Sequence, residues 1–293
     1  MGRTFTVTRL ANALSEGTEL WVIFTVLGTA AAEGWPGIWC ACDACREAAK
    51  LGGRDIRRRA AYNIDDRVQI DLGPDALAQQ WQFGLDYTKL EHLFFTHSHD
   101  DHCLPSNLNY RREGYSILPE DNHLVIHGND AVEQLLEKHC SPLPHLQAEY
   151  KRLVPFRTID AGEGLLVTPI MADHADEEEA VNFLLESGEG TLLQGNDTGW
   201  WPDETWEFLA TKQITVVFLD CTYGLHSGGR SHLGAPEVVD AMAHLETVGA
   251  LAPKARRIAT HFSHNGAALH HELVDYFEPH GIQVAYDGLS VEF

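Results

Sequence analysis

Apolar residues recur along this chain in short runs that stop at glycine or polar residues, a pattern typical of strands alternating with helices. Residues 20–27, rich in Trp, Val, Ile and Phe, end at Gly28 and predict a buried strand, and runs at 60–63 and 68–72 predict a hairpin. Further strands are predicted at 123–127, 183–185, 191–193, 216–219 and 282–286, the last as the closing strand, with helices at 76–83, 130–139, 236–245 and 267–277 and Asp130 as an N-cap. This alternation predicts a layered α/β fold.

The length and composition are those of a globular protein. The chain has 293 residues, of which 44% are hydrophobic and 22% charged. Since α/β sandwiches of this size often form one unit, we expect a single domain over 1–293, with an N-terminal segment 1–20 of unclear role. The N-terminus lacks the basic-then-apolar layout of a signal peptide, and the apolar stretch 20–32 is too short to span a bilayer. A cytoplasmic protein with no membrane partner is therefore predicted.

The charge balance is strongly acidic. The 21 Lys and Arg residues stand against 43 Asp and Glu residues, which gives a formal net charge of −22. A protein that grips a nucleic-acid backbone needs a basic face, so no nucleic-acid partner is expected. A small anionic substrate remains compatible with this charge, because two divalent metals would supply about four positive charges locally.

The segment 96–102, Thr-His-Ser-His-Asp-Asp-His, carries the candidate chemistry. It follows the apolar run 93–95, and the alternation of His97 and His99 points both imidazoles the same way from an extended backbone. Asp101 and His102 follow where the chain turns and can face a second point nearby. Imidazole and carboxylate ligands suit Zn, Mn or Fe better than Ca. Two adjacent cation sites are therefore predicted from one loop.

This H-x-H-x-D-H spacing resembles that of the metallo-β-lactamase superfamily of binuclear hydrolases. The resemblance implies an αββα four-layer sandwich and further ligands at the ends of apolar strands, and the sequence offers His174, Asp197 and His261 in that order. The implied assignment is His97, His99 and His174 on one metal and Asp101, His102 and His261 on the other, with Asp197 bridging the two. The resemblance also suggests that Asp71 accepts a hydrogen bond from a ligating imidazole. Asp220, at the end of the apolar run 216–219, could do likewise, and a plain strand-end carboxylate is the alternative for both.

Three cysteines form a second cluster. Cys40, Cys42 and Cys45 make a C-x-C-x-x-C pattern near 34–50, and three thiolates this close fit one tetrahedral structural zinc that needs a fourth ligand. A redox pair or three buried thiols are the alternatives. A disulfide framework is not expected in a reducing compartment.

Together the Leu-Gly-Thr of 27–29, the cysteine cluster, the H-x-H-x-D-H loop and Thr-His-Phe-Ser-His at 260–264 resemble the phosphoribosyl 1,2-cyclic phosphodiesterases of the carbon–phosphorus lyase pathway. That resemblance implies His264 as the fourth ligand of the structural zinc and His232 as the residue that assists departure of the leaving group. It implies hydrolysis of a small cyclic phosphodiester of the ribose 1,2-cyclic phosphate type, and often a homodimer.

Other functions remain open at this point. A lactonase or thioesterase could use the same metals, and the Trp-Pro approach to the cysteines also resembles a relative in pyrroloquinoline quinone biosynthesis. A non-catalytic metal-binding protein is the third alternative. The chain departs from the family pattern at 103–105, where Cys-Leu-Pro replaces the usual glycine, and at 173–179, which is unusually acidic beside a metal site.

Overall fold

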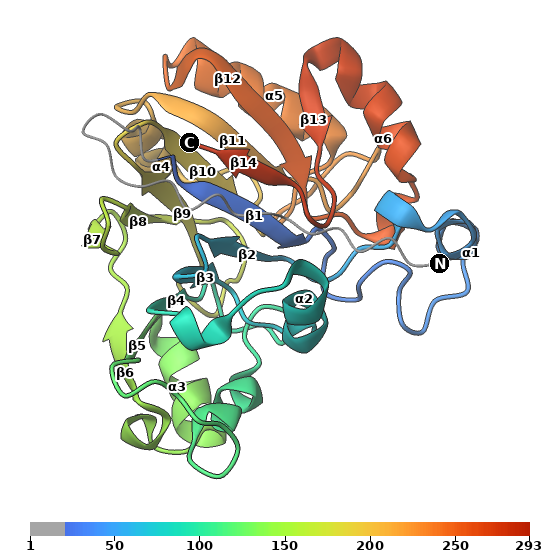
Figure 1. The fold of residues 1–293 in the computed structure, drawn as a ribbon. Coiled ribbons are helices and arrows are strands. Elements are labelled where there is room, and N and C mark those ends of the chain that lie inside the picture. Colours follow the sequence, from blue (N-terminus) through green and yellow to red (C-terminus); the bar gives the residue numbers. More distant parts are fainter. Residues whose placement is uncertain (1–20) are drawn as a thin grey trace.

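The computed structural model describes residues 21–293, so the N-terminal segment 1–20, whose role the sequence left unclear, lies outside the described residues. Fourteen strands are present among these residues, in two sheets of seven (Figure 1). The first sheet has the order β14-β1-β2-β3-β4-β5-β6. Its strands are β1 (Ile23–Gly28), β2 (Ala61–Ile64), β3 (Val68–Ile70), β4 (His92–Phe94), β5 (Leu124–Gly128), β6 (Ala148–Arg152) and β14 (Ser290–Glu292).

The second sheet has the order β13-β12-β11-β10-β9-β8-β7. Its strands are β7 (Ile159–Asp160), β8 (Leu166–Met171), β9 (Val181–Glu186), β10 (Thr191–Gly195), β11 (Ile214–Asp220), β12 (Leu251–Thr260) and β13 (Ile282–Val284). In each sheet four adjacent strands that reach one edge run parallel, β3 to β6 in one and β10 to β13 in the other. Loops that follow parallel neighbours emerge at the same edge, which brings distant parts of the sequence together.

Helices cover the outer faces of both sheets. The α-helices are α1 (Asp43–Leu51), α2 (Ala76–Phe83), α3 (Asp130–His139), α4 (Asp203–Leu209), α5 (Ala235–Thr247) and α6 (His270–Phe277), with short 3-10 helices at Gly53–Asp55, Tyr87–Lys89, Pro105–Arg111, Leu143–Leu146, His264–Gly266 and Glu278–His280. Apolar residues of α2 and α3 pack with strands of the first sheet, and those of α4, α5 and α6 with the second. A third apolar cluster, which includes Phe24, Phe94, Phe183 and Phe218, fills the space between the sheets. The arrangement is the predicted αββα sandwich (Figure 1).

Most predicted elements are present, and three predictions were wrong in detail. Asn129 rather than Asp130 is the N-cap of α3, since its side chain accepts a hydrogen bond from Val132 N at 3.0 Å. The closing strand is β14, which pairs with β1, and the predicted strand 282–286 is the edge strand β13. Helix α6 begins at His270 rather than at 267, because Ala267 adopts a left-handed backbone with φ of 51°.

Gly28 at the end of β1 is required by close packing. A Cβ atom at this position would lie 1.9 Å from the backbone oxygen of Arg59, so any side chain would force the two segments apart. The residues after Gly28 pair with the segment that follows β12. Ala31 N donates to Phe262 O at 3.0 Å, and Ala30 forms isolated bridges with both Arg59 and Phe262. The loop between β1 and α1 is thereby fixed against the segment that follows β12.

Candidate metal centres

The predicted ligands come from loops at the ends of four strands. The H-x-H-x-D-H loop follows β4, His174 follows β8, Asp197 follows β10 and His261 follows β12. The structure brings all seven predicted residues of this site together in overlapping groups of close ligand atoms. Because the two sheets fix the backbone where each strand ends, the side chains that follow these strands are held close together.

The first group is His97, His99 and His174. Nε2 of His97 lies 2.9 Å from Nδ1 of His99, and Nε2 of His174 lies 3.2 Å from the same Nδ1. A tetrahedral zinc with bonds of about 2.0 Å to nitrogen places its ligand nitrogens about 3.3 Å apart. The three nitrogens therefore have the spacing of one coordination sphere.

The second group is Asp101, His102 and His261, with Asp197 between the groups. Oδ2 of Asp197 lies 2.9 Å from Nε2 of His102 and 3.1 Å from Nε2 of His261, and its Oδ1 lies 3.8 Å from Nε2 of His174. The Nε2 atoms of His102 and His261 are buried, and neither has a hydrogen-bond partner in the described part of the chain. Buried polar atoms are normally satisfied, so these lone pairs fit a cation that all of them face.

A further layer of side chains orients the imidazoles. Oδ2 of Asp71 lies 2.7 Å from Nδ1 of His102, and both carboxylate oxygens of Asp71 accept hydrogen bonds from Thr96. Asp220 Oδ2 lies 2.9 Å from Nδ1 of His232 and 3.3 Å from Nδ1 of His261. The predicted hydrogen bonds that imidazoles donate to Asp71 and Asp220 are thus present, and they fix the ring orientation and tautomer.

Thr222 lies where these contacts meet. Its Oγ1 is 3.1 Å from Asp220 Oδ2, 3.1 Å from Nδ1 of His232 and 2.9 Å from Nδ1 of His261. Nothing in the sequence marks this threonine, because a hydroxyl two residues beyond a strand end is common.

The buried carboxylates give the cluster a negative character. Burial lowers the pKa of His102, but the charges of Asp101, Asp197 and Asp71 outweigh it and raise that pKa well above its ordinary value. Burial raises the pKa of Asp197, and the charges of His261 and His102 outweigh this effect and hold the pKa well below its ordinary value. These carboxylates favour positive charge at the positions that the imidazole Nε2 atoms face, as divalent cations would provide.

Three residues of the site hold a left-handed backbone. The φ angles are 61° at Asp71, 54° at Asp197 and 59° at His261, a region that residues with side chains seldom adopt. Asp71 and His261 come directly after strands β3 and β12, and Asp197 comes two residues after the end of β10. Such conformations cost about 1–3 kcal/mol each and persist where the surrounding structure imposes them.

A cavity of about 300 Å³ opens onto the cluster. It is lined by the predicted ligands His99, Asp101, His174, Asp197 and His261 and by His232. Nδ1 of His232 faces Asp220, which leaves Nε2 as the ring nitrogen available to a bound molecule. Burial lowers the pKa of His232, but the Asp220 carboxylate more than offsets this and raises the pKa to about 9.

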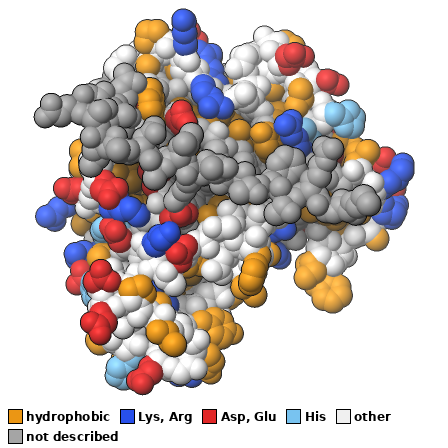
Figure 2. Space-filling view, viewed as in Figure 1, with side chains coloured by type: hydrophobic (Ala, Val, Ile, Leu, Met, Phe, Trp, Pro, Cys, Tyr) orange, Lys and Arg blue, Asp and Glu red, His pale blue; other side chains and the backbone are white. Residues whose placement is uncertain are grey.

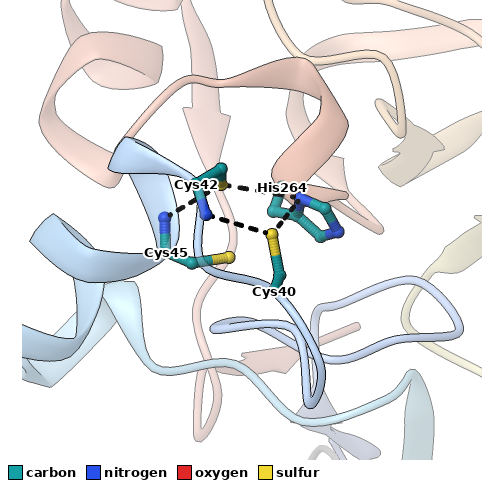
Figure 3. Close-up of side chains that lie close together, drawn as sticks. All are labelled: Cys40, Cys42, Cys45 and His264. Atoms are coloured by element: carbon teal, nitrogen blue, oxygen red, sulfur yellow. Dashed lines mark hydrogen bonds between the residues drawn. The ribbon is translucent and has the colours of Figure 1, made fainter.

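The cysteine cluster lies beside this cavity, between α1 and the segment after β12 (Figure 3). Cys40, Cys42, Cys45 and His264 place their ligand atoms within 4.8 Å of one another. Nδ1 of His264 lies 3.5 Å from Cys40 Sγ and 3.8 Å from Cys42 Sγ. A tetrahedral zinc with bonds of about 2.0–2.3 Å separates its ligand atoms by about 3.5–3.8 Å. The donor set and its spacing therefore fit one structural zinc.

Backbone amides support the sulfur atoms. Gly37 N donates to Cys45 Sγ at 3.3 Å. Cys42 N donates to Cys40 Sγ and Cys45 N to Cys42 Sγ, both at 3.4 Å (Figure 3). The hydrogen bond from Cys45 N is the main cause that lowers the pKa of Cys42 to about 7, while burial raises that of Cys45 to about 12. The six cysteines of the chain are free in this structure.

The acidic run 173–179 has a structural explanation in Glu178. Its carboxylate accepts hydrogen bonds from Ser98 N at 3.1 Å and Ser98 Oγ at 2.7 Å, and from Asn129 Nδ2 at 2.8 Å. Since Ser98 lies between His97 and His99, Glu178 fixes the first ligand loop. Sequence reasoning noted the acidity but missed this contact, because it joins residues eighty positions apart.

Comparison with known proteins identifies the family. The family model described as "Beta-lactamase superfamily domain" matches residues 66–262, about two thirds of the chain. The chain belongs to the metallo-β-lactamase superfamily. Proteins of this superfamily that have the metallo-β-lactamase fold are metal-binding hydrolases. The chain is accordingly a metal-binding hydrolase.

Solved structures with the same fold include two that span nearly the whole chain. A crystal structure described as that of a new diphosphatase from the PhnP family is 26% identical, with a TM-score of 0.71, and the match covers 93% of this chain and 98% of that one. Zn²⁺-bound PqqB from Methylobacterium extorquens is 16% identical, with a TM-score of 0.70 and coverage of 92% and 100%. The likeness to PqqB concerns the fold alone.

Among curated proteins, a ribonuclease Z from Parabacteroides distasonis is 30% identical over 87 residues. The match spans 28% of this chain and about a quarter, 27%, of that relative. None of the helices within residues 21–293 has the length and apolar character needed to cross a membrane.

Proposed function

We propose that this protein is a binuclear metal-dependent phosphodiesterase that opens a small cyclic phosphodiester of the ribose 1,2-cyclic phosphate type. One observation carries the proposal: Asp197 faces two groups of candidate ligand atoms at once, and His232 lies at the same cavity with Asp220 orienting its ring. Such a cluster suits a reaction in which charge develops on phosphoryl oxygens.

The residues fit two divalent metals, with Zn, Mn and Fe as the candidates. His97, His99 and His174 would hold one and Asp101, His102 and His261 the other, with Asp197 shared between them. When bound, such a metal pair supplies a nucleophile from water at neutral pH and neutralises charge on the phosphoryl group. A third metal, a structural zinc, would be held by Cys40, Cys42, Cys45 and His264 in the insert near 34–50.

His232 would act as the proton donor. Water adds to phosphorus and loses one proton to solvent, the bond from phosphorus to the leaving oxygen breaks, and the proton on Nε2 of His232 passes to that oxygen, giving a monoester. A proton from solvent then restores the protonated form of His232, so that the net reaction consumes one water. Asp220 holds Nδ1 of the ring and stabilises its protonated form. Protonation at the leaving oxygen favours departure of an alkoxide, which is otherwise a poor leaving group.

A small substrate accords better than RNA with the described surface. The net charge is −22, and on the face in Figure 2 Lys and Arg side chains are interspersed with Asp and Glu side chains rather than gathered into a basic area. A cavity of about 300 Å³ is at the small end of ligand sites. A cytoplasmic location, a single domain over the whole chain and a homodimer stay predictions.

The proposal is tested by activity of the metal-loaded protein on ribose 1,2-cyclic phosphate, a diphosphate ester, a lactone panel and a thioester. The diphosphate ester is included because the relative that is 26% identical is described as a diphosphatase. Turnover of the cyclic diester well above that of the lactones and thioester supports the proposal. Turnover of lactones alone, with no phosphoester hydrolysed, overturns it.

The role of His232 is tested by leaving-group dependence. His232→Ala should lower kcat by about 10²–10⁴-fold on a diester with an alkoxide leaving group. It should lower kcat much less on bis(p-nitrophenyl) phosphate, whose leaving group needs no proton. His226→Ala, an exposed histidine of the same loop, is the matched control and should leave both rates unchanged. An equal loss on both substrates contradicts the acid role.

A further inference from the structure

One wall of the cavity carries none of the candidate metal ligands. Tyr223 and Asn265 line it from the segments that follow β11 and β12, and the loop between β1 and α1 contributes Ala31, Ala32 and Glu33. An aromatic ring, a side-chain amide and a carboxylate thus lie beside two small residues. A wall of this mixed character suits the part of a substrate that does not react.

Two glycines fix the backbone of this wall. A Cβ atom on Gly224 would lie 2.8 Å from Cα of Gly266, and one on Gly266 would lie 2.6 Å from the backbone nitrogen of Gly224. Gly224 also has φ of 53°, a value that residues with side chains seldom adopt. The segments that carry Tyr223 and Asn265 are therefore in direct backbone contact, and the fold holds both side chains at the cavity.

The wall adjoins His232. The ring centroids of Tyr223 and His232 are 6.3 Å apart, with the ring planes at 73°. Tyr223 N donates to Leu233 O at 3.1 Å, which ties this segment to the residue after His232. A group whose leaving oxygen contacts Nε2 of His232 would therefore lie within reach of the tyrosine ring. The alcohol half of the substrate belongs on this side of the cavity, and the phosphate belongs beside the metal positions.

Both side chains are available to a ligand. Tyr223 is 36% exposed and Asn265 is also exposed, and neither side chain makes a hydrogen bond within the part of the chain that the structure describes. A furanose ring presents C–H groups on its faces and hydroxyl groups at its rim. An aromatic ring packs on such a face, and an amide can both donate to and accept from hydroxyl groups.

We propose that Tyr223 and Asn265 form the subsite for the sugar of the substrate, with the Tyr223 ring packed on the sugar face and the Asn265 amide hydrogen-bonded to a hydroxyl group. The proposal rests on the proposed function, because the reacting phosphate must occupy the metal positions. The subsite selects cyclic phosphodiesters built on a sugar ring over those of an acyclic diol. Tyr223 thus determines specificity and takes no part in the proton transfer from His232.

Two cyclic diesters that differ in their alcohol test the subsite. Ribose 1,2-cyclic phosphate and 1,2-propanediol cyclic phosphate share the same cyclic phosphate, and only the first has a sugar ring. For the metal-loaded wild type we expect kcat/KM to be at least about tenfold higher on the sugar substrate. Tyr223→Ala should lower kcat/KM on that substrate about tenfold, mainly through KM, and change it less than about twofold on the propanediol substrate.

Two further variants separate the contributions of the ring and the amide. Tyr223→Phe keeps the ring and should stay within about twofold of the wild type on both substrates. Asn265→Ala should lower kcat/KM on the sugar substrate about fivefold and leave the propanediol substrate unchanged. Tyr110→Ala is the matched control, because Tyr110 is exposed and does not line the cavity, and it should leave both values unchanged.

The proposal is overturned if the wild type shows no preference for the sugar substrate, if Tyr223→Ala affects both substrates equally or neither, or if Tyr223→Phe is as impaired as Tyr223→Ala. Failure of the proposed function is seen separately, as a metal-loaded protein that hydrolyses neither diester. Calorimetry then still tests the subsite, because Tyr223→Ala should weaken binding of ribose 1-phosphate about tenfold and leave binding of inorganic phosphate unchanged. Equal or no weakening for the two ligands, or no measurable binding of ribose 1-phosphate, contradicts the subsite.

Discussion

The two candidate metal centres are assembled in different ways. The histidine–aspartate centre draws its ligands from the ends of β4, β8, β10 and β12, and carboxylates such as Asp71 and Asp220 hold its imidazoles. The cysteine centre takes three of its four ligands from six consecutive residues, supported by amides of the same loop, and only His264 comes from elsewhere.

The difference indicates what each centre does for the molecule. A site built on strand ends of both sheets is positioned by the whole sandwich, which suits chemistry that depends on exact geometry. A site built on one loop orders that loop, and His264 ties the loop to the segment that carries His261. Loss of a ligand should therefore change activity at the first centre and folding of the β1–α1 loop at the second.

The largest expected effect is on Asp197, which faces both ligand groups. Asp197→Asn should lower hydrolysis of the best phosphodiester by more than about 10³-fold, beyond the 10–100-fold typical of outer-layer changes. Elemental analysis should find fewer than two metals at the active site while the structural zinc remains. Asp203→Asn, an exposed residue of α4, is the control and should retain activity. Full metal content and activity in Asp197→Asn would contradict the bridging role.

At the cysteine centre, replacement of a ligand should lower the stability of the protein and leave the active-site metals bound. Cys42→Ser should release one zinc per chain, keep the two active-site metals, and reduce the free energy of unfolding by about 4 kcal/mol, a size that loss of a structural metal can produce. Cys140→Ser, in which the hydroxyl can still donate to Pro105 O, should retain all metals and lose little stability. Loss of the active-site metals in Cys42→Ser would show that the two centres are not separate.

A smaller effect on activity or metal affinity is expected at Asp71, which contacts the candidate ligand His102 on the side away from the metal positions. Asp71→Asn should lower activity or metal affinity about 10–100-fold, because the amide holds Nδ1 of His102 less strongly than the carboxylate. Asparagine tolerates the left-handed backbone of this position, so thermal unfolding should change little. Titration of metal into the apo-protein, compared with wild type, checks the prediction. A large fall in unfolding temperature with unchanged metal affinity would make Asp71 a folding residue instead.

The smallest effect concerns a buried imidazole without carboxylates around it. His127 Nε2 lies 3.0 Å from His92 Nδ1, and its ring stacks on Phe94 with centroids 4.3 Å apart. Burial, with the charges of His92 and Lys151 adding to it, lowers the pKa of His127 to about 3. The unfolded chain therefore binds this proton more tightly, and stability that is present above about pH 6.5 is lost as the pH falls toward 3.

His127→Gln should remove part of this acid sensitivity, on the order of 1–2 kcal/mol between pH 7 and pH 4. Denaturant unfolding at a series of pH values measures it. His139→Gln, exposed on α3, should follow the wild-type profile. A His127→Gln profile parallel to the wild type would mean that another group carries the acid dependence.

Local patterns in the sequence predicted a layered α/β fold and the first candidate ligand loop, whereas the αββα sandwich and the downstream ligand candidates came from the resemblance to a family. Apolar runs that stop at His97, Asp197 and His261 mark strand ends, and the spacing of the first ligand loop is specific to the family. The fourth zinc ligand, His264, came from the resemblance and not from spacing. What could not be predicted lies in pairings between distant segments: Glu33 with Ser263, Glu178 with Ser98, and Thr222 with both His232 and His261.

The wrong predictions of secondary structure also arose from contacts between segments that are distant in the sequence. Asn129 and Asp130 are both good cap residues, and tertiary packing rather than residue type decides which one caps α3. Strand β14 is only Ser290–Glu292, too short to give a periodic signal, and its pairing with β1 joins the two ends of the described chain.

The left-handed backbone at Asp71, Asp197 and His261 has a consequence for directed evolution of this protein. Glycine at any of the three positions would relieve the conformational strain, by about 1 kcal/mol or more per position. A library selected only for heat resistance or expression yield would therefore enrich glycine at the residues that we expect to be needed for hydrolysis. Thermostable variants should instead be sought with turnover included in every round, so that mutations accumulate in the helical layers and the strand ends are preserved.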